Sequence, residues 1–232
     1  MPDGRHSAEM ALAARASAAL GSRSGGATLL HGPAGVGKTR LALALGGRLG
    51  NARVVWLHVE RVLCAARPEA ALHAELAAAR AAAPCVLVVD ELQSLAPADA
   101  RPGSPEARLA LQLGDGVQDL RSAAVYALGI CREPEAVHAA LRRAGRIHTQ
   151  IALRAPPPDE RAAMLEALAE GLLPPTSGDD EGAATRMRAV VRAVGMDGHG
   201  LCGAHLEALC QHAATAAWRR SHGESSDAAS PR

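Results

Sequence analysis

A chain of 232 residues and 23.8 kDa can form one large domain, or a domain with a small satellite. Lysine and arginine nearly balance aspartate and glutamate (25 against 24), which excludes the basic excess of nucleic-acid-binding chains and the acidic block of a solvated tail. Aromatic residues are 1% of the chain and phenylalanine is absent, so alanine, leucine and valine must fill the core by close helix packing.

The first predicted elements lead to a glycine-rich stretch. Residues 7–20 are alanine-rich and predict a helix, and residues 21–26 predict a loop. The apolar residues 27–30 predict a strand, and residues 40–45 have the alanine and leucine content of a helix. Residues 31–39 lie between this strand and this helix, and they read His-Gly-Pro-Ala-Gly-Val-Gly-Lys-Thr.

Residues 32–39 match G-x-x-x-x-G-K-[ST], the phosphate-binding loop, in the strand–turn–helix context that the motif needs. Glycines let backbone N–H groups converge on phosphate oxygens, and the following helix adds its positive N-terminal end. Lys38 supplies a mobile charge for the β- and γ-phosphates, and the Thr39 hydroxyl can ligate Mg²⁺. The alternative is a glycine-rich surface turn. The predicted nucleotide-binding residues here are Gly32, Pro33, Ala34, Gly35, Val36, Gly37, Lys38, Thr39 and Arg40.

Two further strands are predicted before the middle of the chain. Residues 52–59 are rich in β-branched side chains and predict a strand, and the apolar spacing of residues 68–83 predicts a helix that Pro84 ends. Residues 85–89 are wholly apolar, as in a parallel strand buried on both faces. Two prolines and a glycine within residues 96–104 predict a loop.

Two acidic residues follow the apolar strand 85–89, at the strand end where open α/β sheets place their ligands. This is typical of a Walker B site: Asp90 would hold hydrated Mg²⁺ together with Thr39, since Mg²⁺ needs few protein ligands. Glu91 would orient and activate the attacking water. An ordinary strand end is the alternative, but a phosphate loop about 50 residues earlier favours a site for ATP and Mg²⁺.

A proline run at residues 155–158 is the clearest domain boundary, because strands and helices alternate before it and only helical patterns follow it. The remaining predicted elements are helices at 105–113 and 134–143, strands at 123–129 and 147–153, and helices at 159–172, 182–194 and 204–219. We therefore predict an α/β P-loop subdomain with a parallel sheet at residues 1–154, an all-helical subdomain at 155–220 and a disordered tail at 221–232.

Five cysteines, an odd number without a C-x-x-C pair, and the lack of a secretory leader predict reduced thiols in a cytoplasmic or nuclear protein. No apolar run approaches about 18 residues, so no membrane span is predicted. Basic residues lack aromatic interleaving, which disfavours a nucleic-acid groove. Cys202, Cys210, Trp56 and Trp218 are predicted to be packing residues.

Three further stretches match known motifs. Residues 129–147 read G-I-C-R-E-P-E-A-V-H-A-A-L-R-R-A-G-R-I. They resemble the second region of homology of the AAA ATPase family, A-T-N-R-P-D-x-[IL]-D-P-A-L-x-R-x-G-R-[FI]. Residues 200–210 resemble the lid segment G-[FY]-x-G-A-D-L-x-x-L-C, and residues 91–97 resemble E-[IL]-D-[AS]-[IL]-A-P. The motifs occur in the family's order over roughly residues 27–220, and the likeness is strongest to the valosin-containing and spermatogenesis-associated-5-like group.

The resemblance implies a nucleotide-binding subdomain, a helical lid and a ring, usually of six subunits, with ATP between neighbours. Arg143 and Arg146 match two arginine fingers, which stabilise charge on the γ-phosphate of the next subunit. The alternative is a pair of solvated arginines at a helix end. Gly203 and Ala204 match lid positions near adenine. The implied function is Mg²⁺-dependent ATP hydrolysis coupled to remodelling of a protein assembly in a homo- or hetero-hexamer.

The chain departs from the family pattern at several positions. Arg132 stands where the family has a sensor asparagine, and arginine cannot accept a hydrogen bond. It could stabilise phosphate charge within its own subunit or point away. Residues 63–68, at the central-pore loop, have neither an aromatic residue nor a glycine, and His205 replaces an aspartate.

These departures leave alternatives open. One is a degenerate nucleotide-binding structural subunit that hydrolyses ATP slowly or not at all. Another is a helicase-loader type of AAA+ protein, which would need a basic wedge that the sequence lacks. Because the sequence begins just before the first strand and covers one module, we expect either a piece of a two-module protein or a divergent single-module relative.

Overall fold

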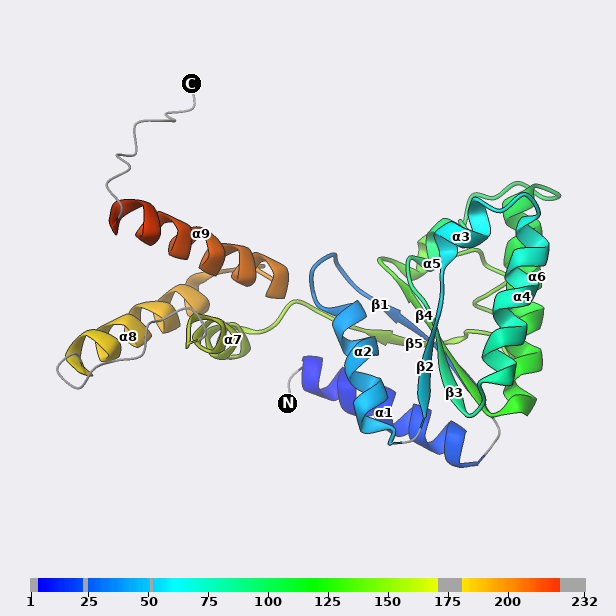
Figure 1. The fold of residues 1–232 in the computed structure, drawn as a ribbon, viewed down its shortest axis with the longest axis horizontal. Helices are drawn as coiled ribbons and strands as arrows, with labels where there is room; N and C mark the ends of the chain where they lie inside the picture. The colour runs from blue at the N-terminus through cyan, green and yellow to red at the C-terminus, as the bar shows by residue number, and fades with distance from the viewer. Residues whose placement is uncertain (1–3, 23–24, 51, 171–180, 222–232) are drawn as a thin grey trace, which may run out of the picture. The chain divides into compact units, whose positions relative to one another are not determined.

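The computed structural model describes residues 4–22, 25–50, 52–170 and 181–221. It divides into two compact units, Met1–Arg154 and Ala155–Arg232. Within the described residues, the first unit holds a five-stranded sheet with helices on both faces, and the second unit is helical (Figure 1).

The elements of the first unit alternate as predicted. Its helices are α1 (Gly4–Gly21), α2 (Lys38–Arg48), α3 (Val59–Leu63), α4 (Pro68–Ala81), α5 (Leu92–Leu95) and α6 (Pro105–Leu120), with 3₁₀ turns η1 (Arg121–Ala123) and η2 (Pro134–Ala136). Its strands are β1 (Gly26–His31), β2 (Arg53–Leu57), β3 (Cys85–Val89), β4 (Val125–Cys131) and β5 (Thr149–Ala152). The second unit holds α7 (Pro158–Glu170), α8 (Glu181–Asp197) and α9 (Gly203–Ser221).

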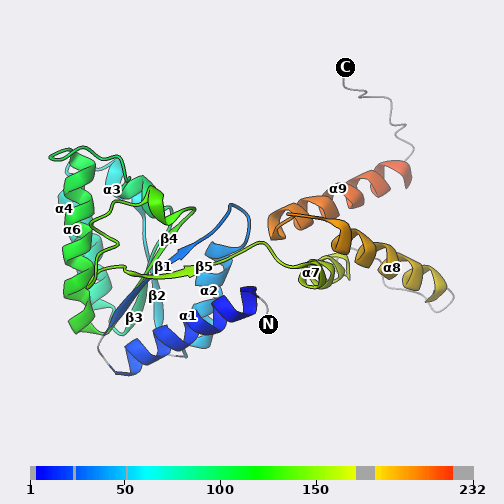
Figure 2. The same cartoon turned by 180° about the vertical axis from the view of Figure 1, so that it is seen from behind.

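The sheet is parallel throughout, in the order β2-β3-β4-β1-β5. Every residue of β3 and β4 is buried, as expected of wholly apolar strands covered on both faces. Helices α1 and α2 cover one face and α4 and α6 the other (Figures 1 and 2). The predicted α/β P-loop fold with C-terminal helices is confirmed.

The core of the first unit is aliphatic, as the composition predicts. Leu29, Leu87 and Leu128 are fully buried. Small residues let the helices approach closely: a Cβ on Gly116 of α6 would lie 2.4 Å from Cδ1 of Leu76 on α4. Close helix packing therefore takes the place of aromatic filling.

The predicted helix at residues 134–143 is wrong. Only η2 is helical, because the following residues pair with the loop after α5 instead. Val137 is fully buried and forms an isolated bridge with Pro97, and the backbone N–H of His138 donates to Ala96 O at 2.9 Å. The predicted strand 52–59 is also too long, since β2 ends at Leu57 and Val59 begins α3.

In the second unit, α7 packs against α8 and α9. A Cβ on Gly195 would lie 2.5 Å from Cα of Ala162, so α7 and α8 are in close backbone contact. Arg161 is 4% exposed, and its guanidinium donates to three backbone carbonyls, those of Pro156, Gly195 and Met196. These bonds satisfy a buried cation and fasten the start of α7 to the end of α8.

Cys202 and Cys210 are buried, as predicted, but Trp218 is 55% exposed, so its expected role in the core is wrong. It lies in the last turn and a half of α9, beyond the part of that helix which contacts α7 through Leu206 and Cys210. The tail predicted at 221–232 lies outside the described residues apart from Ser221. None of the helices in the described ranges combines the length and the apolar character required to cross a bilayer.

Candidate functional site

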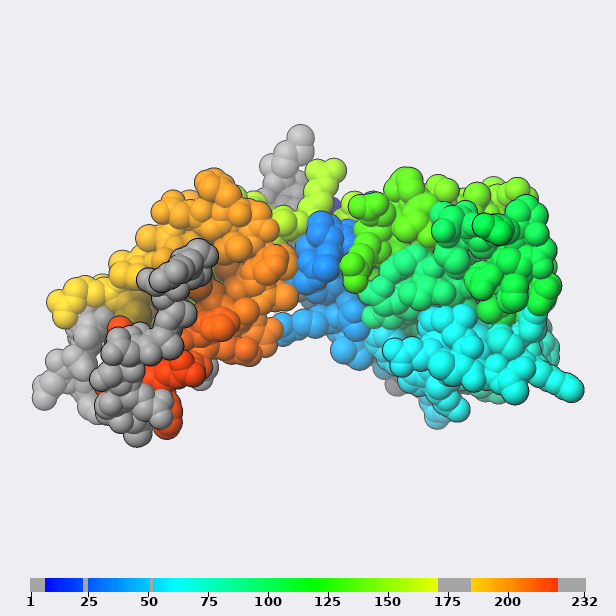
Figure 3. Space-filling model, turned by 90° about the horizontal axis from the view of Figure 1, so that it is seen from above, coloured from blue at the N-terminus to red at the C-terminus, as the bar shows by residue number. Residues whose placement is uncertain are grey.

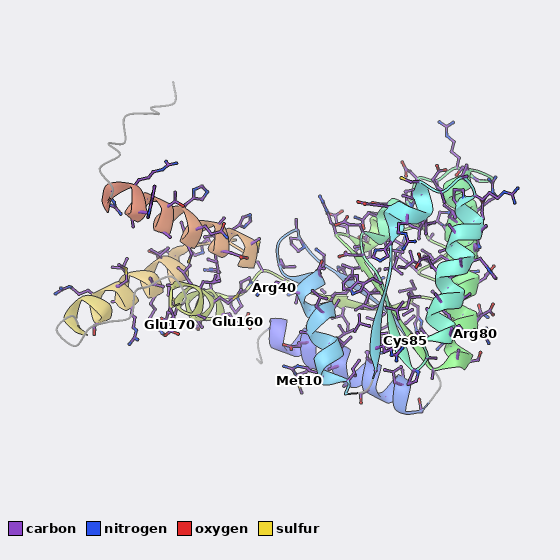
Figure 4. All side chains as sticks on the ribbon, in the orientation of Figure 1. Met10, Arg40, Arg80, Cys85, Glu160 and Glu170 are labelled. Carbon is purple, nitrogen blue, oxygen red and sulfur yellow. The ribbon has the colours of Figure 1, made fainter. Side chains whose placement is uncertain are left out.

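The phosphate loop joins β1 to α2, and three of its residues, Gly32, Gly35 and Gly37, have a positive φ that favours glycine. Gly32 has φ 151°, and a Cβ there would lie 2.0 Å from the carbonyl oxygen of Leu153. Leu153 in turn donates its N–H to His31 O at 2.7 Å, so the loop begins against the end of β5. Gly37 has φ 96° and caps α2, whose first turn carries Arg40 (labelled in Figure 4).

Lys38 lies inside the loop. Its side-chain Nζ donates to Gly32 O at 2.7 Å and to Pro33 O at 2.8 Å, and the residue is only 9% exposed. Burial lowers the pKa of Lys38, while the charges of Glu91 and Asp90 act in the opposite direction. The ammonium group therefore lies within electrostatic reach of both acidic residues that follow β3.

Asp90 and Thr39 meet although they are 51 residues apart in sequence. The Thr39 hydroxyl donates to Asp90 Oδ2 at 2.8 Å, which joins the first turn of α2 to the carboxyl end of β3. Asp90 Oδ1 accepts the backbone N–H of Glu91, also at 2.8 Å. A hydroxyl and a carboxylate oxygen at this separation are the hard oxygen donors that suit Mg²⁺, so these two side chains fit the metal.

Glu91 has an unusual backbone. Its φ of 48° and ψ of 45° are left-handed, a conformation that few residues other than glycine adopt. Its exposed side chain accepts a hydrogen bond from the amide of Gln93, whose Oε1 is buried without a partner among the described residues. Gln93 was not predicted to be a site residue, because α5 between Leu92 and Leu95 is too short to show a period.

The end of β4 borders the same loop. Arg132 follows β4, and its carbonyl oxygen accepts the N–H of Gly32 at 3.0 Å. Its guanidinium is exposed, and its charge contributes to lowering the pKa of Lys38. Burial raises the pKa of the neighbouring Cys131 thiol to about 11.

The other predicted site residues lie farther along the chain. Arg143 is exposed on the turn between η2 and β5, whereas Arg146 is held by contacts to α6. Gly203 and Ala204 open α9 in the second unit. Residues 63–68, which match the pore loop, are mostly exposed and lie where α3 ends and α4 begins. In the space-filling view they belong to the cyan part of the surface (Figure 3).

Burial of Cys131 makes a testable prediction. With a pKa of about 11, about one Cys131 thiol in 3,000 is ionised at pH 7.5, and Cys85 has the same raised pKa because it too is buried. Cys64 is exposed at the end of α3. Iodoacetamide at pH 7.5 is expected to alkylate Cys64 at least about 100 times faster than the two buried thiols, measured by peptide mass spectrometry. A Cys64→Ser variant is the control, and rapid labelling of Cys131 in it would contradict the prediction.

Comparison with known proteins agrees with this geometry. The chain is 32% identical over 211 residues to human peroxisomal ATPase PEX6, which covers 87% of this chain and 20% of that protein. It is 30% identical over 199 residues to human ATPase family gene 2 protein homolog A (83% and 21%), and 31% identical over 156 residues to mouse nuclear valosin-containing protein-like (64% and 18%). The chain thus spans about a fifth of the length of these relatives.

The sequence model of the family described as "ATPase family associated with various cellular activities (AAA)" matches residues 28–155. That range runs from β1 to the first residue after the sheet unit and includes the phosphate loop, the two acidic residues after β3 and both candidate arginine fingers. Together with the parallel sheet and the contact between Thr39 and Asp90, the match identifies this chain as a member of the AAA family of ATPases.

Proposed function

We propose that this chain binds ATP with Mg²⁺ and hydrolyses it. The observation that carries the proposal is the 2.8 Å hydrogen bond between Thr39 and Asp90, which brings the acidic end of β3 to the phosphate loop. Lys38 and Glu91 are within electrostatic reach of each other beside this bond. A cation, a hydroxyl and two carboxylates at one edge of the sheet are what phosphoryl transfer to water requires.

In this proposal the triphosphate lies on the backbone N–H groups of the loop and the first turn of α2. Lys38 exchanges its bonds to the Gly32 and Pro33 carbonyls for charge-assisted hydrogen bonds to phosphate oxygens. Thr39 and Asp90 would hold Mg²⁺, which, when bound, neutralises charge on the phosphate oxygens.

Glu91 accepts a proton from the attacking water, and its exposed carboxylate at the end of β3 leaves room for that water. Arg143 is proposed as the arginine finger that stabilises charge on the γ-phosphate of a neighbouring subunit, since its side chain is exposed. Gly203 and Ala204, at the start of α9, are proposed to pack near adenine, because they match the family's lid positions.

We propose that hydrolysis is coupled to remodelling of a protein assembly in a homo- or hetero-hexameric ring in the cytoplasm or nucleus. The names of two relatives support a role of this class: a ribosome biogenesis ATPase of Saccharomyces cerevisiae, 31% identical over 155 residues, and the peroxisomal ATPase of human. Measuring the mass in solution with and without ATP tests the ring. A strict monomer under both conditions would contradict it, because no neighbour could then supply Arg143.

One observation favours a second candidate, a structural subunit that binds nucleotide and hydrolyses it slowly. Arg132 occupies the sensor position, and a guanidinium cannot accept a hydrogen bond from the attacking water. A single-turnover assay of the parent beside Arg132→Asn separates the two candidates. A fast parent supports the ATPase, and an increase of at least about tenfold in Arg132→Asn would instead support the slow structural subunit.

A further inference from the structure

Arg143 and Arg146 lie on one closed loop of the first unit. Buried Leu141 and Ile147 fix its two ends, and the N–H of Ile147 donates to Leu141 O at 2.9 Å. Between them the chain turns through Gly145, with φ 87°. Arg143 lies exposed on this turn, and no hydrogen bond or ion pair of its guanidinium is seen among the described residues.

Arg146, unlike Arg143, is largely buried and makes side-chain contacts. Its side chain is 16% exposed and forms an ion pair with Asp115 on α6 through Nη2. Its Nη1 donates to Ala140 O at 3.0 Å, so one guanidinium joins α6 to the residue that precedes the loop. A fork of fixed donors that engages two acceptors in this way is suited to fastening a segment in one geometry.

The sequence of α6 supports this contact independently. Gly114 is in the interior of α6, where glycine is unfavourable relative to alanine. A Cβ at Gly114 would lie 2.8 Å from Cδ, Nε and Cζ of Arg146, so the guanidinium lies directly on the helix backbone. The missing side chain is what lets Arg146 reach Asp115.

A second arginine also contacts the loop. Arg121, in η1 at the end of α6, donates through Nη1 to Gly145 O at 3.2 Å. The turn that carries Arg143 is therefore held at Gly145 by Arg121 and at Ala140 by Arg146.

We infer that Arg146 is a positioning residue that acts within its own chain: it clamps the loop 141–147 to α6 through Asp115 and Gly114 and leaves Arg143 as the arginine that reaches outward. The resemblance to the family implies that both arginines are fingers, whereas this inference keeps that role for Arg143 alone. The purpose of the clamp rests on the proposed role of Arg143, but the clamp itself does not require that the chain hydrolyses ATP.

The test compares three variants that loosen the clamp in different ways. Arg146→Gln removes the charge, Asp115→Asn removes its partner, and Gly114→Ala adds a methyl group that displaces Arg146 while it improves the helix propensity of α6. Asp119→Asn, on an exposed position of the same helix, is the matched control. The protein is digested with trypsin under native conditions, and cleavage after Arg143 is compared with cleavage after exposed Arg154.

All three variants are expected to raise the relative rate of cleavage after Arg143 about tenfold, and Asp119→Asn is expected to leave it unchanged. Combining Asp115→Asn with Arg146→Gln is expected to add nothing further, because both remove one contact. At saturating ATP, the three variants are expected to lower turnover to a similar extent with the dissociation constant for ATP unchanged. A general loss of stability would not produce this pattern, since Gly114→Ala favours the helix.

One pattern of results would overturn the inference. If Arg146→Gln abolishes turnover while Asp115→Asn and Gly114→Ala match the parent in cleavage and turnover, Arg146 acts across a subunit interface and the inference is overturned. A parent without turnover would contradict the proposed function alone, because the cleavage rates still decide whether the clamp exists.

Discussion

Glu91→Gln is expected to bind ATP as tightly as the parent and to lose at least about 100-fold in turnover. The amide keeps the size of the side chain but cannot accept a proton, and a positioned general base contributes about 10²–10⁴-fold to a rate. Binding survives because Lys38, Thr39 and the loop backbone, which would hold the triphosphate, are unchanged. Turnover is measured by phosphate release under single-turnover conditions, and affinity by titration with a fluorescent ATP analogue.

Glu60→Gln on α3 is the matched control, since it changes an exposed glutamate away from the phosphate loop and is expected to keep the parental rate. Turnover by Glu91→Gln at the parental rate would show that another group accepts the proton. A loss of ATP affinity in the same variant would show instead that Glu91 holds the loop or the metal, and its catalytic role would have to be withdrawn.

Lys38→Ala is expected to weaken ATP binding by at least about 100-fold. A charge-assisted hydrogen bond contributes about 1.5–3 kcal/mol. The buried ammonium group of Lys38 is expected to donate more than one such bond to the β- and γ-phosphates, so its loss weakens binding by this factor or more. The variant also frees the carbonyls of Gly32 and Pro33, so its thermal unfolding must be recorded beside the titration.

Arg48→Ala provides the comparison for Lys38→Ala. It removes a cation from the last turn of the same helix, where its ion pair with Glu9 is partly exposed to solvent and contributes little to stability. Its ATP affinity is expected to equal that of the parent. If Lys38→Ala is folded and binds ATP normally, the triphosphate does not lie on the loop, and the proposed site is wrong.

The sequence predicts the parts of the fold in which one local rule applies over several residues. The run from Cys85 to Val89 is uniformly apolar, and its strand is found with the expected bounds because nothing competes with burial on both faces. The strand, glycine turn and helix around Lys38 were also recognisable, since the glycines of the turn stand where the backbone has a positive φ.

Elements shorter than two helical turns could not be predicted, since they show no period. Helices α3 and α5 fall in this class, and with α5 the bond from Gln93 to Glu91 was missed. Residues 134–143 have the composition of a helix, but the bridge from Val137 to Pro97 prevails over their propensity. The contact between Arg146 and Asp115 joins residues 31 positions apart, and only the tertiary structure brings them together.

The close approach of Leu153 to Gly32 has a mechanical consequence. Leu153 is the penultimate residue of the sheet unit. Its backbone N–H donates a hydrogen bond to His31 O, directly before the phosphate loop. The last residues of the sheet unit are therefore fixed at the phosphate loop, so a displacement of Gly32 would meet the Leu153 carbonyl directly. The segment that leads out of the sheet unit is thus anchored beside the site proposed for the triphosphate.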